Sequence, residues 1–209
     1  MNNLFFGGSS DLALELSNKI KFTDAVSQKK ITGKYRKTFQ VNDYSNISLR
    51  KIKKDIDQKY DNILIFNGYY SASFLSIFNS KKFFDAYKIN FIKPIEIAVF
   101  VLKNNLLKKG GSIFFFSSAA ANEDLIGNAF YSIAKNSLNL SSKILSNEQK
   151  ERGVRINTIS LGLIKNDMGI KAKNLTNSNK KFLSTNMVLK RITSILRNKK
   201  LNKKNIKIV

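Results

Sequence analysis

Short apolar runs alternate with longer segments of helical periodicity along most of this chain. The run at residues 62–66 is continuously apolar, as expected of a strand covered on both faces. Strands are predicted at residues 4–6, 31–35, 39–41, 62–66, 110–118, 153–160 and 205–209, and helices at residues 11–20, 48–60, about 82–107 and from 131 onwards. This alternation predicts an α/β fold with a doubly wound parallel sheet.

Two connections stand out in this pattern. The predicted strands at 31–35 and 39–41 leave no room for a crossover helix, so a loop or a single turn should join them. Pro94 is the only proline and should bend or restart the helix at about 82–107. Because there is no internal repeat and no linker rich in Pro, Gly or Ser, residues 1–209 are predicted to form a single domain.

Composition narrows the chemistry. A chain of 209 residues with 43% hydrophobic content suits one domain with a sizeable core. It has no cysteine and no histidine, which excludes disulfides, a thiol nucleophile, a Ser-His-Asp relay and the usual zinc sites. Any metal would need carboxylates alone, and these are few, so no metal site is expected.

The amino terminus enters an apolar strand directly, without a basic region and a long apolar stretch, which argues against a signal peptide. No apolar run approaches the roughly 18 residues of a membrane span. We therefore expect a cytoplasmic protein with no membrane partner.

The formal net charge of +23 raises the question of nucleic acid. The basic residues are spread along the chain in pairs, with no single stripe and no recognised nucleic-acid motif. Abundant Lys, Asn, Ile and Phe instead suggest coding bias towards A and T. No specific nucleic-acid partner is expected, although such a field attracts polyanions and phosphorylated substrates.

The strongest chemical signal is the pair Tyr131 and Lys135, with Ser118 upstream at the end of a predicted strand. Residues at i and i+4 share one helix face, so the ammonium can lie near the phenol and favour its ionised form. A free phenol has a pKa of about 10 and is a poor base at neutral pH. A lowered pKa would let Tyr131 exchange a proton with a carbonyl oxygen that Ser118 holds.

Ser118 precedes Tyr131 by 13 positions, and Asn90 precedes Ser118 by 28. With these intervals the chain resembles the short-chain dehydrogenase/reductase family, which carries an Asn-Ser-Tyr-Lys tetrad on a single-domain Rossmann-type fold. The resemblance implies an NAD(P)-dependent oxidoreductase that reduces a carbonyl or oxidises an alcohol. It assigns proton transfer to Tyr131, substrate orientation to Ser118, a lowered tyrosine pKa and the nicotinamide ribose to Lys135, and a bound water to Asn90.

The family's cofactor turn, Thr-Gly-x-x-x-Gly-x-Gly, is altered in this chain. Residues 6–13 read Phe-Gly-Gly-Ser-Ser-Asp-Leu-Ala, which keeps Gly7 but places Asp11 and Ala13 where the later glycines stand. Those glycines let the backbone approach the pyrophosphate. Asp11 can repel phosphate or cap the helix, and the resemblance makes Ser9, Ser10 and the backbone as far as Leu12 the expected phosphate contacts.

An acid after the second strand favours NAD, and a base favours NADP. The predicted second strand runs into residues 34–37, Lys-Tyr-Arg-Lys, which favours NADP(H) over NAD(H) and makes Arg36 the expected contact; an ordinary solvated lysine cluster is the alternative. Asn67 and Gly68 match the core of the family's Asn-Asn-Ala-Gly turn. By the same resemblance, Gly162, Ile164 and Asn166 lie near the nicotinamide.

The segment at residues 168–184 is shorter than the family's substrate lid, so the pocket is expected to be open. An open pocket suits a large polar substrate, such as a nucleotide-linked sugar or a carrier-bound acyl group, better than a small apolar ketone. The helix that begins at Tyr131 commonly contributes to a dimer or tetramer interface in the family, although its apolar residues can equally cover the sheet. A non-catalytic binding or scaffold protein that has lost tight cofactor binding remains the alternative.

Overall fold

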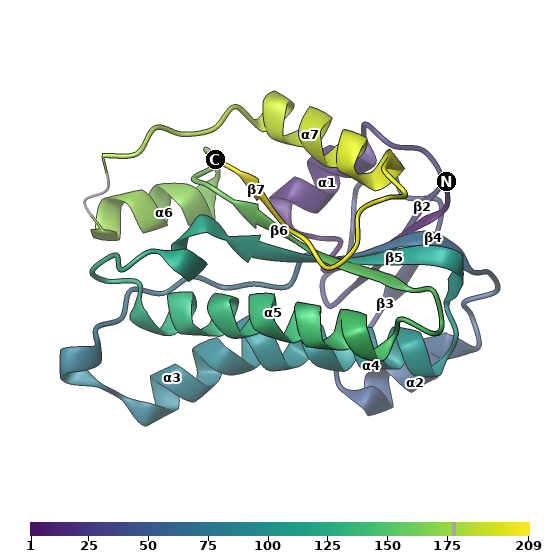
Figure 1. Cartoon of the computed structure of the whole chain (residues 1–209), viewed down its shortest axis with the longest axis horizontal. Helices are drawn as coiled ribbons and strands as arrows, with labels where there is room; N and C mark the ends of the chain where they lie inside the picture. The colour runs from purple at the N-terminus through teal and green to yellow at the C-terminus, as the bar shows by residue number, and fades with distance from the viewer. Residues whose placement is uncertain (177–178) are drawn as a thin grey trace.

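The computed structural model, which describes residues 1–176 and 179–209, contains a parallel sheet of seven strands with helices on both faces (Figure 1). The order of the strands in the sheet is β3-β2-β1-β4-β5-β6-β7, and every pairing is parallel. The strands are β1 (Asn3–Phe6), β2 (Thr23–Ser27), β3 (Thr38–Gln40), β4 (Tyr60–Ile65), β5 (Leu107–Ser118), β6 (Arg155–Leu161) and β7 (Asn205–Ile208). The predicted doubly wound α/β fold is therefore confirmed.

The helices form two layers. One face of the sheet carries α2 (Asn46–Lys53), α3 (Ser80–Tyr87), α4 (Lys93–Lys103) and α5 (Ala129–Glu148), and the other carries α1 (Asp11–Ser17), α6 (Asp167–Thr176) and α7 (Thr185–Arg197) (Figure 1). Short helical turns are η1 (Leu75–Ile77), η2 (Lys88–Ile92) and η3 (Ala119–Asn122). No helix within the described residues is long and apolar enough to cross a membrane.

Each face has its own buried core because the central strands are covered on both sides. Leu4, Phe6, Ile63 and Phe115 pack towards α2, α4 and α5, while the alternate residues of the same strands pack towards α1 and α7. Side chains of successive residues in a strand point to opposite faces, so both sets must be apolar. This requirement produces the continuous apolar runs that made β1, β4 and β5 visible in the sequence.

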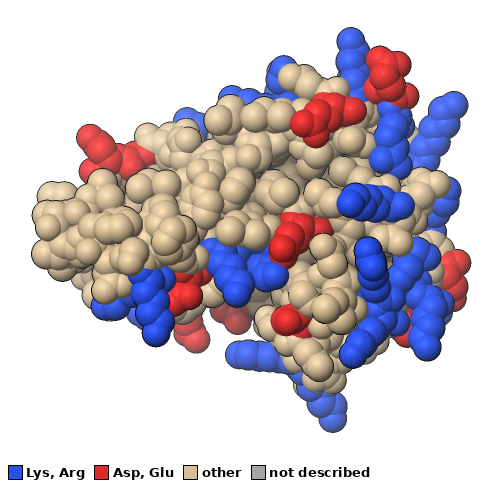
Figure 2. All heavy atoms as spheres, turned by 90° about the horizontal axis from the view of Figure 1, so that it is seen from below, with Lys and Arg blue, Asp and Glu red and all other residues tan. Residues whose placement is uncertain are grey.

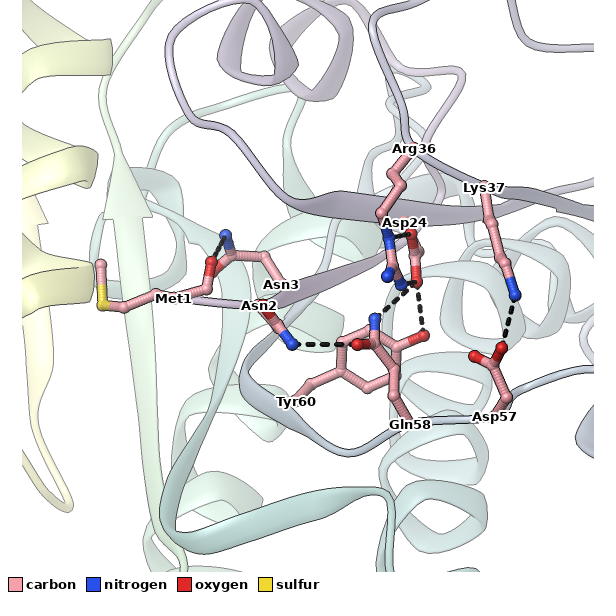
Figure 3. Close-up of polar contacts among 9 residues, drawn as sticks. All are labelled: Met1, Asn2, Asn3, Asp24, Arg36, Lys37, Asp57, Gln58 and Tyr60. Atoms are coloured by element: carbon pink, nitrogen blue, oxygen red, sulfur yellow. Dashed lines mark hydrogen bonds and ion pairs between the residues drawn. The ribbon is translucent and has the colours of Figure 1, made fainter.

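The position predicted for the second strand is wrong. β2 is Thr23–Ser27, and residues 31–35 lie in the connection that leads to β3. A fully buried carboxylate, Asp24, lies in β2 and accepts hydrogen bonds from Arg36, Gln58 and Tyr60 (Figure 3). A search for apolar runs did not find this strand, because it contains a charged residue whose charge is neutralised by residues distant in the sequence. As predicted, no helix joins β2 to β3.

The break expected near Pro94 lies just before it. The helical segment that begins at α3 passes through one π-helical turn, η2, and continues as α4, with Pro94 in the first turn of α4. Proline is tolerated there because the first helical amides have no intrahelical partner. A π turn inserts one extra residue into the helix and often occurs at functional sites. Here it contains Asn90.

The surface beneath α3, α4 and α5 has an uneven distribution of charge (Figure 2). Its α3 end is largely free of charged side chains, whereas Lys and Arg residues gather at the opposite end. Several large apolar side chains at or near α3 are exposed, namely Phe74, Leu75, Ile77, Phe78 and Phe84. On this face, the positive charge is therefore concentrated at one end (Figure 2).

Candidate active site

A cavity opens at the carboxyl ends of the strands. It has a volume of about 400 Å³ and extends from Ser10 and Leu12, at the start of α1, to Tyr131 and Lys135 on α5 and on to Met168 on α6. Its floor includes the stacked rings of Phe66 and Phe116, whose centroids are 4.1 Å apart. Sheets of this topology bind ligands at this edge, where the strand order reverses between β1 and β4.

Tyr131 and Lys135 lie one turn apart on α5, as their spacing predicts, and both line the cavity. Lys135 is buried, and its Nζ donates to the carbonyl oxygens of Phe116 at 3.0 Å and Asn67 at 3.4 Å. The same nitrogen lies 5.8 Å from the centroid of the Tyr131 ring. Two strand ends therefore hold the Lys135 amine beside the tyrosine.

Burial determines the protonation of this pair in the structure. It lowers the pKa of Lys135 to about 7 and raises the pKa of Tyr131 to about 12, against which a hydrogen bond with Ser118 acts. The prediction that Lys135 lowers the pKa of Tyr131 is therefore not borne out here. Desolvation outweighs the lysine because the same burial that brings the amine near the phenol disfavours the ammonium form.

Ser118 is the last residue of β5 and lines the same cavity. Its Oγ accepts a hydrogen bond from the backbone N–H of Ala120 at 3.2 Å, which caps the short helical turn η3. Its hydroxyl also lies close enough to Tyr131 to lower the pKa of the phenol. The strand end and the cap fix the hydroxyl beside the phenol, so the two groups can act on one substrate oxygen.

Asn90 is completely buried and does not line the cavity. Its side chain accepts from the backbone N–H of Tyr69 at 3.0 Å and donates to the carbonyl oxygens of Tyr69 at 2.8 Å and Ala86 at 2.9 Å. These bonds clamp the segment after β4 to the π turn. Gly68 lies in the clamp, where an added Cβ would come 3.3 Å from the Lys135 Nζ and 3.4 Å from the Asn90 Oδ1.

The turn after β1 is held from within. The backbone N–H groups of Gly7 and Gly8 donate to the carbonyl oxygen of Val26, and the N–H of Gly7 also donates to the Tyr44 hydroxyl. On the other side of the turn, the Tyr35 hydroxyl donates to the carbonyl oxygen of Gly8 at 2.7 Å. Gly7 has a φ of +78°, which only glycine adopts without cost. Two tyrosines thus fix this turn.

The altered positions of the turn have different surroundings. Ser10 caps α1 by accepting from the backbone N–H of Ala13, and Asp11 is exposed in the first turn of α1, at the cavity. Ala13 is fully buried in the core between α1 and the sheet, so the last glycine position accepts a methyl group. Ser9, like Gly7 and Asn67, does not line the cavity itself.

The predicted cofactor contact Arg36 is misplaced. Because β2 ends at Ser27, Arg36 does not follow that strand. Its backbone N–H donates to the carbonyl oxygen of Thr23, at the amino end of β2, and its guanidinium binds both carboxylate oxygens of Asp24, at 2.9 and 2.5 Å (Figure 3). It therefore lies away from the edge of the sheet that carries the cavity. Gln28, Lys29 and Lys30 are the residues that follow β2.

The residues after β6 reach the cavity as expected, since Gly162, Ile164 and Asn166 all line it. The Asn166 Oδ1 accepts from the backbone N–H of Gly169 at 2.9 Å, so this side chain caps the amino end of α6. The first part of the segment predicted as a short lid, residues 168–184, forms α6, and residues 177 and 178 lie outside the described residues.

Sequence reasoning missed several polar residues of the cavity, among them Tyr70 and Asn128. Both are buried, and neither the Tyr70 hydroxyl nor the Asn128 Oδ1 has a hydrogen-bond partner among the described residues. Their sequence positions give a partial signal, because Tyr70 lies two residues after Gly68 and Asn128 three before Tyr131. Nothing local in the sequence shows that their polar atoms are unpaired.

Comparison with known proteins agrees with this geometry. The family model described as Enoyl-(Acyl carrier protein) reductase matches residues 34–197. Among curated proteins, none matches the chain.

Solved structures resemble the whole fold at low sequence identity. A protein from Listeria innocua aligns with a TM-score of 0.83 at 16% identity, with all of both chains covered. A short chain dehydrogenase family protein from Francisella tularensis aligns with a TM-score of 0.80 at 17% identity, covering 99% of this chain and 96% of that one. A short chain dehydrogenase from Burkholderia cenocepacia, solved in complex with NADP, aligns with a TM-score of 0.81 at 14% identity, covering 99% and 95%.

Proposed function

The chain belongs to the short-chain dehydrogenase/reductase family of oxidoreductases, and we propose that it reduces a carbonyl group to an alcohol, or catalyses the reverse reaction, with NADP(H) as hydride carrier. The observation that carries the proposal is the convergence of Ser118, Tyr131 and Lys135 on one cavity at the carboxyl edge of the sheet. Three different functional groups, from a strand end and a helix, face one space there. A chance Tyr-x-x-x-Lys pair on a surface helix would not have this surrounding.

Residues at the cavity and below it support the binding of a dinucleotide. An added Cβ on Gly7 would come 3.3 Å from the backbone nitrogen of Asn67, so β1 and β4 are closely apposed below the site. The Asn67 Oδ1 is a buried acceptor without a partner. The Ser10 hydroxyl and the backbone N–H groups of Asp11 and Leu12 would hold the pyrophosphate, with Ser9 beside them. Gly162 and Ile164 would contact the nicotinamide. A bound nicotinamide would supply or accept the hydride.

The chain's own residues then control the proton and the substrate oxygen. Tyr131 donates its phenolic proton to the carbonyl oxygen during reduction, and Ser118 holds that oxygen by a hydrogen bond. The Lys135 amine lies close enough to the cavity to bind a ribose hydroxyl and to return a proton to the phenol. Asn90 keeps residues 67–70 in place by its hydrogen bonds with Tyr69. Gly68 in this segment has no side chain, which leaves room for the Lys135 amine beside it.

The proposed preference for NADP(H) rests on the residues that follow β2. Lys29 and Lys30 come directly after Gln28 at the carboxyl end of β2, and no Asp or Glu occurs between Asp24 and Asp43. A 2′-phosphate is therefore met by cations and by no nearby carboxylate of this segment. These two lysines replace Arg36 in the proposal.

A second candidate is a non-catalytic protein that keeps the fold without tight cofactor binding. It is favoured by the turn after β1, where Gly7 and Gly8 donate to Val26 and a carboxylate, Asp11, faces the cavity. An anion close to the start of α1 opposes a second anion there.

Nicotinamide fluorescence separates the two candidates. We expect the purified protein to bind NADPH with a lower Kd than NADH, because the 2′-phosphate gains two nearby cations. Titration of the protein into each dinucleotide, with a change in fluorescence intensity as the signal, measures both constants. If neither binds at millimolar concentration, the oxidoreductase proposal fails and the second candidate stands. Tighter binding of NADH would overturn the preference for NADP(H).

The direction of the reaction should respond to pH through Tyr131. Since its pKa is about 12, the phenol is protonated throughout the neutral range and is ready to donate in reduction. Oxidation needs the phenolate, whose fraction rises tenfold with each pH unit below the pKa. We therefore expect log kcat/KM for alcohol oxidation to rise with a slope near one from pH 7 to 10, measured in buffers of constant ionic strength. A plateau below pH 9 would show that another group governs the step.

An exposed apolar surface on the helices supports self-association. Exposed apolar residues occur along α3, η2 and α5, among them Phe84, Ile89, Ile133, Leu140 and Ile144. Such a surface supports a homodimer or homotetramer formed through these helices. We further propose a cytoplasmic protein and a substrate with polar groups in addition to its carbonyl.

A further inference from the structure

Tyr70 places a phenol beside the proposed proton donor. It lines the cavity, is only 3% exposed, and has its ring edge-on to the ring of Tyr131, with 5.5 Å between the centroids. Buried tyrosine hydroxyls usually have a hydrogen-bond partner, but this one has none among the described residues. Burial raises its pKa, so the hydroxyl keeps its proton as a donor.

Asn128 is a second unpaired group in the same wall. It precedes the first residue of α5, where an asparagine side chain normally caps the helix by accepting a backbone N–H bond. Here it does not cap the helix, because the Ser73 hydroxyl accepts from the backbone N–H of Phe130 at 2.9 Å instead. The side chain of Asn128 is therefore not used as a helix cap. Its Oδ1 is buried at the cavity without a hydrogen-bond partner among the described residues.

Both residues are rigidly held. The backbone of Ser73 bonds with Gly127 and Ala129 on either side of Asn128, and the Asn90 clamp fixes Tyr69, the neighbour of Tyr70. Unpaired polar groups on a rigid wall keep their positions before a ligand arrives. A preorganised site of this kind binds a complementary polar group at little entropic cost.

Both groups lie in the wall of the cavity that Tyr131 also lines. Tyr70 touches the ring of Tyr131, and Asn128 precedes it by three residues, about one helical turn. A substrate whose carbonyl oxygen is bonded to Tyr131 would therefore present a group on a neighbouring carbon to this part of the wall. The phenol can donate and accept, while an amide oxygen accepts, so a hydroxyl group satisfies both.

We propose that Tyr70 and Asn128 form a subsite for a hydroxyl group beside the reacting carbonyl, so that the enzyme prefers α-hydroxy ketones or vicinal diols. This inference rests on the proposed oxidoreductase function. Apolar residues around the subsite, including Leu125 and Met168, hold the carbon skeleton. A simple ketone leaves both polar groups unpaired in a buried wall, and such sites discriminate strongly against analogues that lack the bonded group.

A pair of ring ketones tests the subsite. The rates of NADPH oxidation with 2-hydroxycyclohexanone and with cyclohexanone give the ratio of the two kcat/KM values. We expect the ratio to be at least about tenfold in favour of the hydroxyketone, and to fall by about tenfold in Tyr70→Phe and in Asn128→Ala. Tyr69→Phe is the matched control, because the Tyr69 ring is exposed and the residue does not line the cavity. It should keep the wild-type ratio.

A binding measurement keeps the outcome separate from catalysis. Saturation-transfer NMR compares trans-cyclohexane-1,2-diol with cyclohexanol on the same proteins, without turnover. If no ketone is reduced but the diol binds more tightly to the wild type than to Tyr70→Phe, the subsite stands and the proposed reaction fails. Equal binding of the diol and cyclohexanol, or a hydroxyketone ratio that Tyr70→Phe leaves unchanged, overturns the subsite.

Discussion

Tyr131→Phe is expected to lower kcat for carbonyl reduction by about a thousandfold, while the Kd for NADPH stays within about twofold of the wild-type value. The substitution removes one oxygen and leaves the ring, so packing against Tyr70 is preserved. What is lost is the proton that the phenol donates to the substrate oxygen. Proton transfer from a positioned side chain contributes about 10²–10⁴-fold to enzyme rates, which sets the expected loss.

The measurement is single-turnover reduction with preloaded NADPH, followed by nicotinamide absorbance, so that product release does not mask the chemical step. Tyr87→Phe is a suitable control, because this tyrosine also carries a bonded hydroxyl, at 3.1 Å from the Ser137 Oγ, but lies outside the cavity. It should keep the wild-type rate. A Tyr131→Phe protein that reduces substrate at a normal rate would assign the proton to another group, and Tyr70 would be the next phenol to examine.

Three of the residues proposed for catalysis, Ser118, Tyr131 and Lys135, lie together at the cavity, because local patterns fix their positions. Ser118 ends a strand that is apolar enough to be recognised. Tyr131 and Lys135 share a helix face because they are four residues apart in one helix. The element order also followed from local patterns, since parallel strands buried on both faces are continuously apolar. These features depend on neighbours within about ten residues.

The pKa values could not be predicted in the same way, because they depend on three-dimensional burial. The Lys135 amine is enclosed by the ends of β4 and β5, which are far from it in the sequence. Its pKa of about 7 thus reflects contacts that the Tyr-x-x-x-Lys spacing does not contain. The unpaired amide of Asn128 has the same origin, since it depends on a cap supplied by Ser73.

The placement of β2 failed for a related reason. Thr23-Asp24-Ala25-Val26-Ser27 has few apolar residues and a charged second residue, whereas residues 31–35 include an isoleucine and a tyrosine. Its strand character depends on β1 and β3 on either side, and on Arg36, Gln58 and Tyr60 around its carboxylate. The wrong strand carried with it the wrong cofactor contact, so one long-range network accounts for both errors.

Arg36→Ala tests that network, and we expect it to lower the free energy of unfolding by about 3 kcal/mol. Asp24 is completely inaccessible to solvent, so removing the guanidinium leaves a buried carboxylate with only neutral donors, Gln58 and Tyr60 (Figure 3). Breaking a buried ion pair typically costs about 3–5 kcal/mol, and the partial exposure of Arg36 puts this case at the lower end. Urea unfolding followed by circular dichroism measures the change.

The neighbouring residue provides a matched control. Lys37 pairs with Asp57 at 2.6 Å, but both side chains are largely exposed, so water replaces the partner and Lys37→Ala should leave the unfolding midpoint unchanged. Asp24→Asn should restore much of the stability of Arg36→Ala, because it removes the unpaired charge itself. The Kd for NADPH should be the same in Arg36→Ala and wild type. A stable Arg36→Ala protein with weakened NADPH binding would return Arg36 to the cofactor site and contradict its structural role.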